Sequence, residues 1–137
     1  MKRLALLFAA LFFAGQVLAA GSLDVLEPWA KPGVGQQAEV YLTLRNSGAE
    51  QDRLVGANSP LATAVQLRTV VQLGSVQSVQ ALKSIGVPAG GQQVLAPGHT
   101  HLLLVGLKRA LVAGEEVPLS LQFEKAGKLQ VQAEVRP

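Results

Sequence analysis

Residues 117–135, VPLSLQFEKAGKLQVQAEV, decide the fold class because they have the pattern of two strands joined by a tight turn. Apolar side chains occupy every second position over residues 117–123 and again over residues 129–135, which is the period of a half-buried β-strand. Residues 124–128, EKAGK, provide the turn, with Gly127 at a position suited to positive φ. This part of the chain is therefore predicted to be an antiparallel β-hairpin.

Several earlier stretches have the same alternation. Residues 38–46, AEVYLTLRN, are the clearest, because Val40, Leu42 and Leu44 share one face and polar or aromatic side chains occupy the other. Further strands are expected at residues 52–57, 65–71 and 97–105. Residues 75–82 are also interpreted as a strand, although the spacing of Val76 and Val79, three residues apart, suits a helical turn as well.

Two segments have a less regular pattern. Residues 22–28, SLDVLEP, alternate weakly and end at a proline, which predicts an edge strand. Residues 85–93 contain Val-Pro-Ala-Gly-Gly and are expected to form a loop. Eight or nine short strands, with turn signals between them and no long helical period, predict an all-β protein: a single antiparallel β-sandwich.

The N-terminal residues have the features of an export signal. Lys2 and Arg3 precede an apolar run of about a dozen residues, and Val17-Leu18-Ala19 offers small side chains to a signal peptidase. We expect residues 1–19 to be a cleaved signal peptide and residues 20–137 to be one periplasmic domain. The apolar run is short for a bilayer span, which needs about 20 residues, so no stable membrane anchor is expected.

Charge and composition argue against nucleic-acid binding. Lys2 and Arg3 are two of the twelve basic residues, so the mature chain would carry ten basic against nine acidic side chains. Trp29, Tyr41 and Phe123 are its only aromatic residues, and they do not alternate with basic ones. The chain contains no cysteine, and its one methionine is Met1. A mature domain would therefore have no sulfur ligand.

No enzymatic constellation is present. Nucleophilic catalysis needs a hydroxyl or thiol beside a base that a third group orients. The two histidines lie two residues apart without an adjacent acid, and no Gly-x-Ser-x-Gly turn occurs. The glycines at 33–35 and 90–91 lack the Lys-Ser/Thr of a phosphate-binding loop, so they are interpreted as turns.

His99 and His101 are the candidate metal ligands. If both lie on one strand, alternation directs them to the same face, where two imidazoles can chelate a transition metal. The alternative is that His101 is a hydrogen-bonded strand residue and that His99 lies in a solvent-facing turn.

The chain resembles the periplasmic copper chaperone family PCu(A)C over nearly all of residues 20–137. The matching stretches include AEVYLTLRNSG at 38–48, DRLVGA at 52–57, VPAGG at 87–91, PG at 97–98, HL at 101–102, GLK at 106–108, VPL at 117–119 and FEKAG at 123–127. The resemblance implies a cupredoxin-like, Greek-key β-sandwich. It also implies a role in carrying copper, for example towards the binuclear copper centre of a cytochrome oxidase.

The resemblance also assigns four copper-ligand positions, which in the family hold His, Met, His and Met. In this sequence they are Arg68, Val79, His101 and Leu103, so only His101 is a ligand. Val79 and Leu103 lack the thioether that suits Cu(I). Arg68 would place a permanent positive charge where a ligand belongs.

We therefore expect a non-enzymatic periplasmic protein with a degenerate copper site. It would bind no metal, or copper weakly through His99 and His101, and would act in copper trafficking or oxidase copper-centre assembly through contacts with the proteins of those pathways. The alternative is a metal-independent interaction module whose docking patch includes Arg68.

Overall fold

Residues 22–137 are described in a computed structural model and form ten β-strands without an α-helix. No helix in this part of the chain has the length and apolarity needed to cross a bilayer. The strands are β1 (Leu23–Pro32), β2 (Gln37–Asn46), β3 (Asp52–Asn58), β4 (Ala62–Leu73), β5 (Val76–Leu82), β6 (Ile85–Val87), β7 (Gly91–Leu95), β8 (His101–Leu107), β9 (Glu116–Phe123) and β10 (Gly127–Val135).

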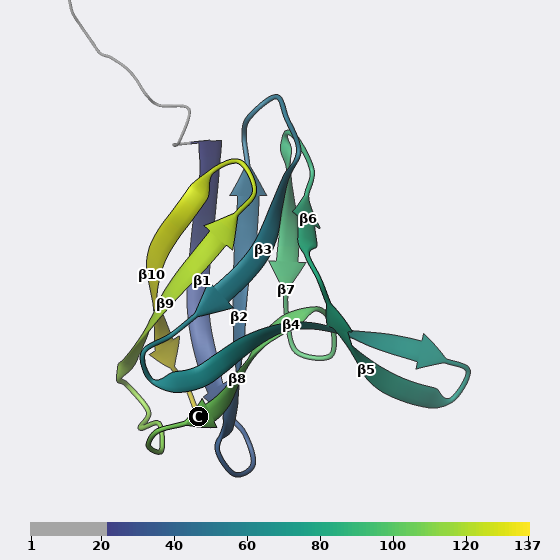
Figure 1. Cartoon of the computed structure of the whole chain (residues 1–137). Helices are drawn as coiled ribbons and strands as arrows, with labels where there is room; N and C mark the ends of the chain where they lie inside the picture. The colour runs from purple at the N-terminus through teal and green to yellow at the C-terminus, as the bar shows by residue number, and fades with distance from the viewer. Residues whose placement is uncertain (1–21) are drawn as a thin grey trace, which may run out of the picture.

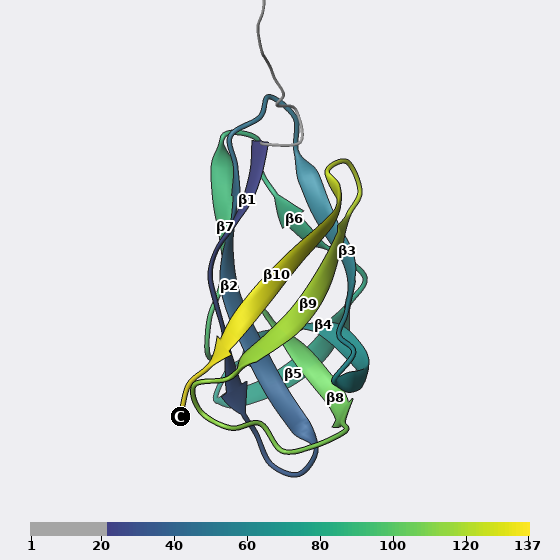
Figure 2. The same cartoon turned by 90° about the vertical axis from the view of Figure 1, so that its left-hand side faces the viewer.

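The strands pair in the order β5-β4-β8-β2-β1-β10-β9-β3-β6, and β7 also pairs with β2. This continuous set of ladders folds over into a sandwich, with β10, β9 and β3 on one side and β2 and β8 on the other (Figures 1 and 2). β4 lies beside β8, and β3 lies beside β9, so neighbours in space are distant in sequence, as a Greek-key sandwich requires. The predicted all-β fold is confirmed.

One pair of strands is parallel in this largely antiparallel structure. β1 and β10 align Trp29 with Glu134 and Ala30 with Val135. Beyond the ladder, the backbone N–H of Arg136 donates to the carbonyl oxygen of Ala30 at 2.9 Å. These contacts join the two sides of the sandwich through its first and last strands.

The core is built from the alternating apolar positions. Val40 and Leu44 of β2 are fully buried, as are Leu102 of β8 and Leu121 of β9. β9 buries every second side chain, which is why the period of two was informative, whereas β8 buries its first four residues in succession. The β9–β10 hairpin forms as predicted, and Gly127 has a φ of 81°.

Two details of the sequence interpretation were wrong. β1 is an interior strand between β2 and β10, and it continues to Pro32 instead of ending at Pro28. A bulge between Leu26 and Trp29, where Glu27 has a φ of 50°, accommodates Pro28 without requiring an amide donor there. Residues 85–93 are not a simple loop, because β6 pairs with β3 and β7 pairs with β2.

Candidate functional site

His101 is the first residue of β8 and is buried, with 4% of its surface exposed. Its ring Nδ1 lies 2.8 Å from the carbonyl oxygen of His99. A carbonyl only accepts hydrogen bonds, so Nδ1 carries the proton and donates, which leaves the lone pair of the neutral ring on Nε2. One ring nitrogen of His101 is thus engaged by the backbone.

His99 lies outside β8, in the turn that precedes it, and is exposed. The turn is closed by the backbone N–H of His99 donating to Ala96 at 3.0 Å and that of Ala96 donating to Thr100 at 3.1 Å. Strand alternation therefore does not extend to His99, and the expectation of two histidines on one strand was wrong. The arrangement is that of the alternative interpretation: a hydrogen-bonded strand histidine and a solvent-facing turn histidine.

The structure brings the four positions assigned by the resemblance to one face of three adjacent strands. Arg68 of β4 is paired with His101 of β8, and Leu103 lies two residues further along the same strand. In the β4–β5 ladder Val79 is paired with Val70, which lies two residues after Arg68. Paired residues and residues two apart share a face, so all four side chains are directed to the same side.

Of these four positions, only His101 supplies a donor group for a metal. Leu103 is 5% exposed, Val79 is 46% exposed, and neither has a coordinating atom. The guanidinium of Arg68 remains protonated and has no acceptor lone pair. Within residues 22–137, no cluster of three or more His, Cys, Asp or Glu side chains could hold a metal ion. The residues at these four positions do not fit a tightly bound copper ion.

An aromatic row lies beside His101. The ring of Tyr41 is 6.4 Å from that of His101, and the ring of Trp29 is 4.8 Å from that of Tyr41. The Arg136 guanidinium carbon lies 5.2 Å from the centre of the Trp29 ring. Sequence alternation places Tyr41 on the polar face of its strand, but it could not indicate that this side chain is only 2% exposed.

The Tyr41 hydroxyl donates to the carboxylate of Glu39 on the same strand. Burial of the phenol, followed by the hydrogen bond and the negative charge of Glu39, raises the pKa of Tyr41 well above its usual range. Tyr41 therefore stays neutral and acts as a donor beside the face of Arg68 and His101.

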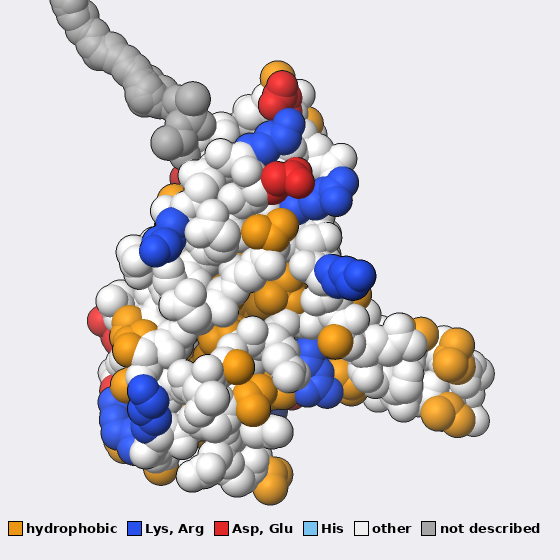
Figure 3. All heavy atoms as spheres, in the orientation of Figure 1, with side chains coloured by type: hydrophobic (Ala, Val, Ile, Leu, Met, Phe, Trp, Pro, Cys, Tyr) orange, Lys and Arg blue, Asp and Glu red, His pale blue; other side chains and the backbone are white. Residues whose placement is uncertain are grey.

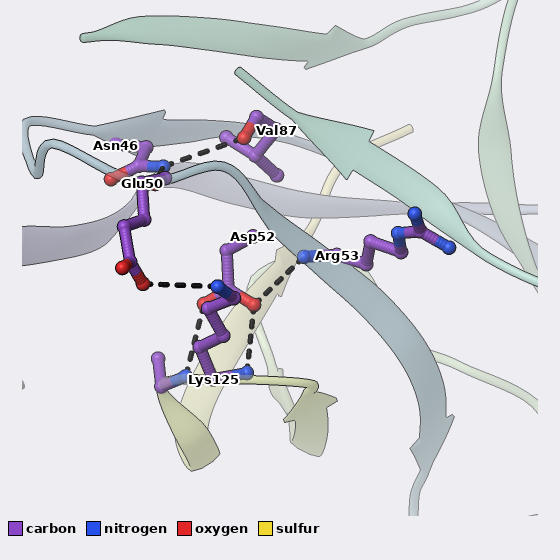
Figure 4. Close-up of polar contacts among 7 residues, drawn as sticks. Asn46, Glu50, Asp52, Arg53, Val87 and Lys125 are labelled. Atoms are coloured by element: carbon purple, nitrogen blue, oxygen red, sulfur yellow. Dashed lines mark hydrogen bonds and ion pairs between the residues drawn. The ribbon is translucent and has the colours of Figure 1, made fainter. Parts of the chain in front are cut away.

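A surface depression of about 460 Å³ is lined by other residues, including Asn46, Glu50, Asp52 and Lys125. Figure 4 shows the polar contacts among these residues. Its buried polar groups already have partners. Asp52 accepts backbone N–H bonds from Arg53 at 2.8 Å, Lys125 at 2.9 Å and Ala126 at 3.0 Å. Asn46 donates to the carbonyl oxygen of Glu50 at 2.7 Å and accepts from Gly48 at 2.9 Å. We interpret this cluster as the connection that fixes the β9–β10 turn to the β2–β3 loop.

Comparison with known proteins identifies the family. The family described as "Putative lipoprotein LpqE-like" matches residues 23–135. This chain belongs to the LpqE-like family. A curated relative, "Putative lipoprotein Lxx21020" of Leifsonia xyli subsp. xyli, is 32% identical over 105 residues. That alignment covers 76% of this chain and 63% of the relative, so the LpqE-like chain spans less than two thirds of the relative's length.

Solved structures similar to the LpqE-like chain include copper-bound domains. The copper-bound PCuAC domain from PmoF2 is 26% identical, with a TM-score of 0.72, and the match covers 87% of this chain and 96% of that domain. The solution structure of CuI-DR1885 from Deinococcus radiodurans is 32% identical, with a TM-score of 0.65 over 83% of this chain and 76% of that one. The LpqE-like chain therefore has the cupredoxin-like β-sandwich of PCuAC domains, as the sequence resemblance implied.

Proposed function

We propose that this LpqE-like protein is an exported, non-enzymatic relative of copper chaperone domains whose own copper site is degenerate. In this proposal it takes part in periplasmic copper trafficking or in assembly of an oxidase copper centre, and it does so through contacts with proteins of those pathways. Copper is the cargo of the pathway and is held weakly or not at all by this chain.

The observation that carries the proposal is the pairing of Arg68 with His101 across β4 and β8. Directly paired residues in an antiparallel ladder have Cβ atoms about 5 Å apart. A fixed guanidinium charge at that separation opposes a copper cation bound to the imidazole. The sandwich keeps the ligand positions on one face, and its side chains disfavour metal there.

His99 and His101 are the remaining route to weak metal binding. His99 is exposed, and its carbonyl oxygen already accepts the bond from His101 Nδ1. Only the Nε2 atom of His101 has a free lone pair on that ring, and His101 is 4% exposed. The buried ring of His101 offers one nitrogen and His99 lies in the exposed turn outside the strand, which supports weak affinity.

Titration of residues 20–137 with Cu(I) in the presence of a competing chelator tests the proposal. We expect the chelator to retain the copper, and the His101→Ala variant to behave in the same way. The triple variant Arg68→His, Val79→Met, Leu103→Met should instead compete, because it restores one imidazole and two thioethers on the face that already holds His101. Tight binding by the unmodified chain, lost in His101→Ala, would contradict a degenerate site.

One observation favours the alternative, a metal-independent interaction module. Arg68 is partly exposed, and within residues 22–137 its guanidinium has no ion pair, whereas Arg45, Arg109 and Arg136 each pair with an acidic side chain. A guanidinium without an ion pair, paired across the strands with the buried His101, suits an acidic group of a protein partner. Deletion of the gene separates the two proposals, because normal oxidase copper loading and copper tolerance would favour the interaction module.

A further inference from the structure

The β4–β5 hairpin projects from the sandwich as a two-stranded arm (Figure 1). β8 pairs with β4 from Ala62 to Arg68, and β5 pairs with β4 from Leu67 to Leu73. Beyond Arg68 the arm therefore has only two strands. β5 lies at one end of the strand order, so the backbone groups along its outer edge have no strand partner within residues 22–137.

The arm is uncharged and exposes several apolar side chains. No Asp, Glu, Lys or Arg occurs from Thr69 to Leu82. Leu73, Val76 and Val79 are 62%, 61% and 46% exposed, and apolar side chains gather at the tip of the arm (Figure 3). Val76 and Val79 are three residues apart on one strand and so lie on opposite faces, which leaves both faces of the arm with exposed apolar surface.

This edge lacks the features that normally prevent strand association. Exposed edge strands are usually protected by a lysine, a proline or a bulge. The β4–β5 ladder is regular from Leu67–Leu82 to Leu73–Val76, and β5 contains no proline or charged residue. A two-stranded ribbon is also only marginally stable in water without further strands. Both considerations point to an additional strand along β5.

We propose that a second copy of this chain pairs with β5, antiparallel, around a two-fold axis. We choose a second copy as the partner because β5 carries no charge. An uncharged strand does not attract an acidic or basic partner, and two copies of it do not repel each other. The register that pairs all seven residues of β5 places Val79 opposite Val79 of the second copy. The contact is isologous and closed, as in most soluble homodimers.

The dimer would join the two candidate sites. Val79 lies on the face that also carries Arg68 and His101. Because directly opposed residues share a face, the two copies present these faces on the same side of one continuous sheet. The order of strands across the junction would be β8-β4-β5-β5-β4-β8. A partner of the assembled protein would meet two Arg68 side chains.

Analytical ultracentrifugation of residues 20–137 over a range of concentrations tests this contact. We expect a reversible dimer for the unmodified chain and a monomer for both Val79→Lys and Val79→Glu. An equimolar mixture of the two variants should recover the dimer, because Lys then faces Glu. Val34→Lys is the matched control: it makes the same change at a residue that is 93% exposed in the β1–β2 loop, and its dimer should persist. Circular dichroism checks that each variant is folded.

Disulfide trapping tests the register. The chain has no native cysteine, so any covalent dimer reports the introduced one. Val79→Cys should cross-link under mild oxidation, whereas Val76→Cys should not, because residue 76 would lie opposite residue 82 and about 20 Å from its own counterpart. A chain that stays monomeric at its highest soluble concentration would overturn the proposal. A dimer that Val79→Lys leaves intact, or one trapped equally well through residue 76, would overturn it too.

Discussion

Tyr41 shows how one side chain can link the candidate face to the stability of the whole sheet. Its ring is buried between those of Trp29 and His101, and its hydroxyl donates to Glu39. Deprotonation of Tyr41 would place a negative charge in a buried position beside a carboxylate, which both desolvation and Coulomb repulsion oppose. The folded protein should therefore hold this proton more tightly than the unfolded chain does.

The raised pKa of Tyr41 predicts a loss of stability at alkaline pH. Below about pH 10, the pKa of an unfolded tyrosine, both states hold the proton and the contribution of Tyr41 is complete. Above it the unfolded chain releases a proton that the folded protein keeps, so the free energy of unfolding falls. Thermal unfolding from about pH 9 to pH 11 should show this fall in the unmodified chain and less of it in Tyr41→Phe.

The chain has one tyrosine, so the phenolate absorbance at 295 nm reports the ionisation of Tyr41 alone and serves as a control for this prediction. The phenolate signal should appear together with unfolding. Its appearance near pH 10 in protein that is still folded would contradict the assignment. At neutral pH, Tyr41→Phe should cost about 1 kcal/mol in urea unfolding, because Glu39 loses a donor.

Asp52 is predicted to be a stability residue. Its two carboxylate oxygens accept three backbone N–H bonds, two of them from the β9–β10 turn, and the residue is 5% exposed. Asp52→Ala should lower the free energy of unfolding by about 3 kcal/mol, since it leaves these donors without an acceptor. Urea unfolding measures the change. Asp24→Ala is the control, because its pair with Arg45 is exposed and should contribute less than about 1 kcal/mol.

The strand β8 requires a glycine near its C-terminal end. Gly106 has a φ of 67°, and the Thr63 hydroxyl of β4 donates to its carbonyl oxygen at 3.2 Å. A Cβ atom added to Gly106 would lie 2.5 Å from Thr63 Oγ1 and 2.8 Å from Thr63 Cβ. The backbone conformation and the close contact both require glycine, and the strand that begins with His101 ends at this point.

Two alanine substitutions distinguish the effect of positive φ from the effect of the close contact with Thr63. Gly106→Ala should destabilise the protein by about 3 kcal/mol, because positive φ and overpacking both contribute. Gly127→Ala should cost only about 1 kcal/mol, since Gly127 has a φ of 81° but no neighbour within 4 Å of an added Cβ. Chemical denaturation compares them, and equal losses would show that the contact with Thr63 has no effect.

The alternation of side chains predicted where most strands lie in the sequence, but not which strands pair with one another. The positions of β2, β9 and β10 follow from side chains that alternate over long runs, and the site face follows from a resemblance in spacing. The interior place of β1 could not be predicted, because it depends on a bulge that accommodates Pro28 and on pairing with β10, which is far away in sequence. The position of His99 depends on where β8 begins, and the strand begins at His101, four residues later than predicted, because periodicity does not fix the ends of a strand. The burial of Tyr41 depends on packing between strands.

At the scale of the whole molecule, the LpqE-like family description includes the word lipoprotein, yet these 137 residues contain no cysteine. Cysteine thiols are the usual attachment points of thioether- and thioester-linked lipids. The expected signal peptide lies within residues 1–21, outside the described part of the structure.

We predict that the exported chain begins at Ala20. Mass spectrometry of the N-terminal peptide of the protein recovered from the periplasmic fraction should identify Ala20 as the first residue. Osmotic shock should release it together with other periplasmic proteins. The mass of the uncleaved chain, or retention in the membrane fraction after a salt wash, would contradict this prediction.

The parallel pairing of β1 with β10 has a consequence for the order in which the protein can fold. A chain that leaves the ribosome or crosses a membrane from its N-terminus presents β1 long before β10. Since Ala30 pairs with Val135, the sandwich cannot close until residue 135 is available. Long-range contacts of this kind slow folding. A chain that closes slowly stays unfolded for longer, and an unfolded polypeptide is the form that threads through a secretion channel.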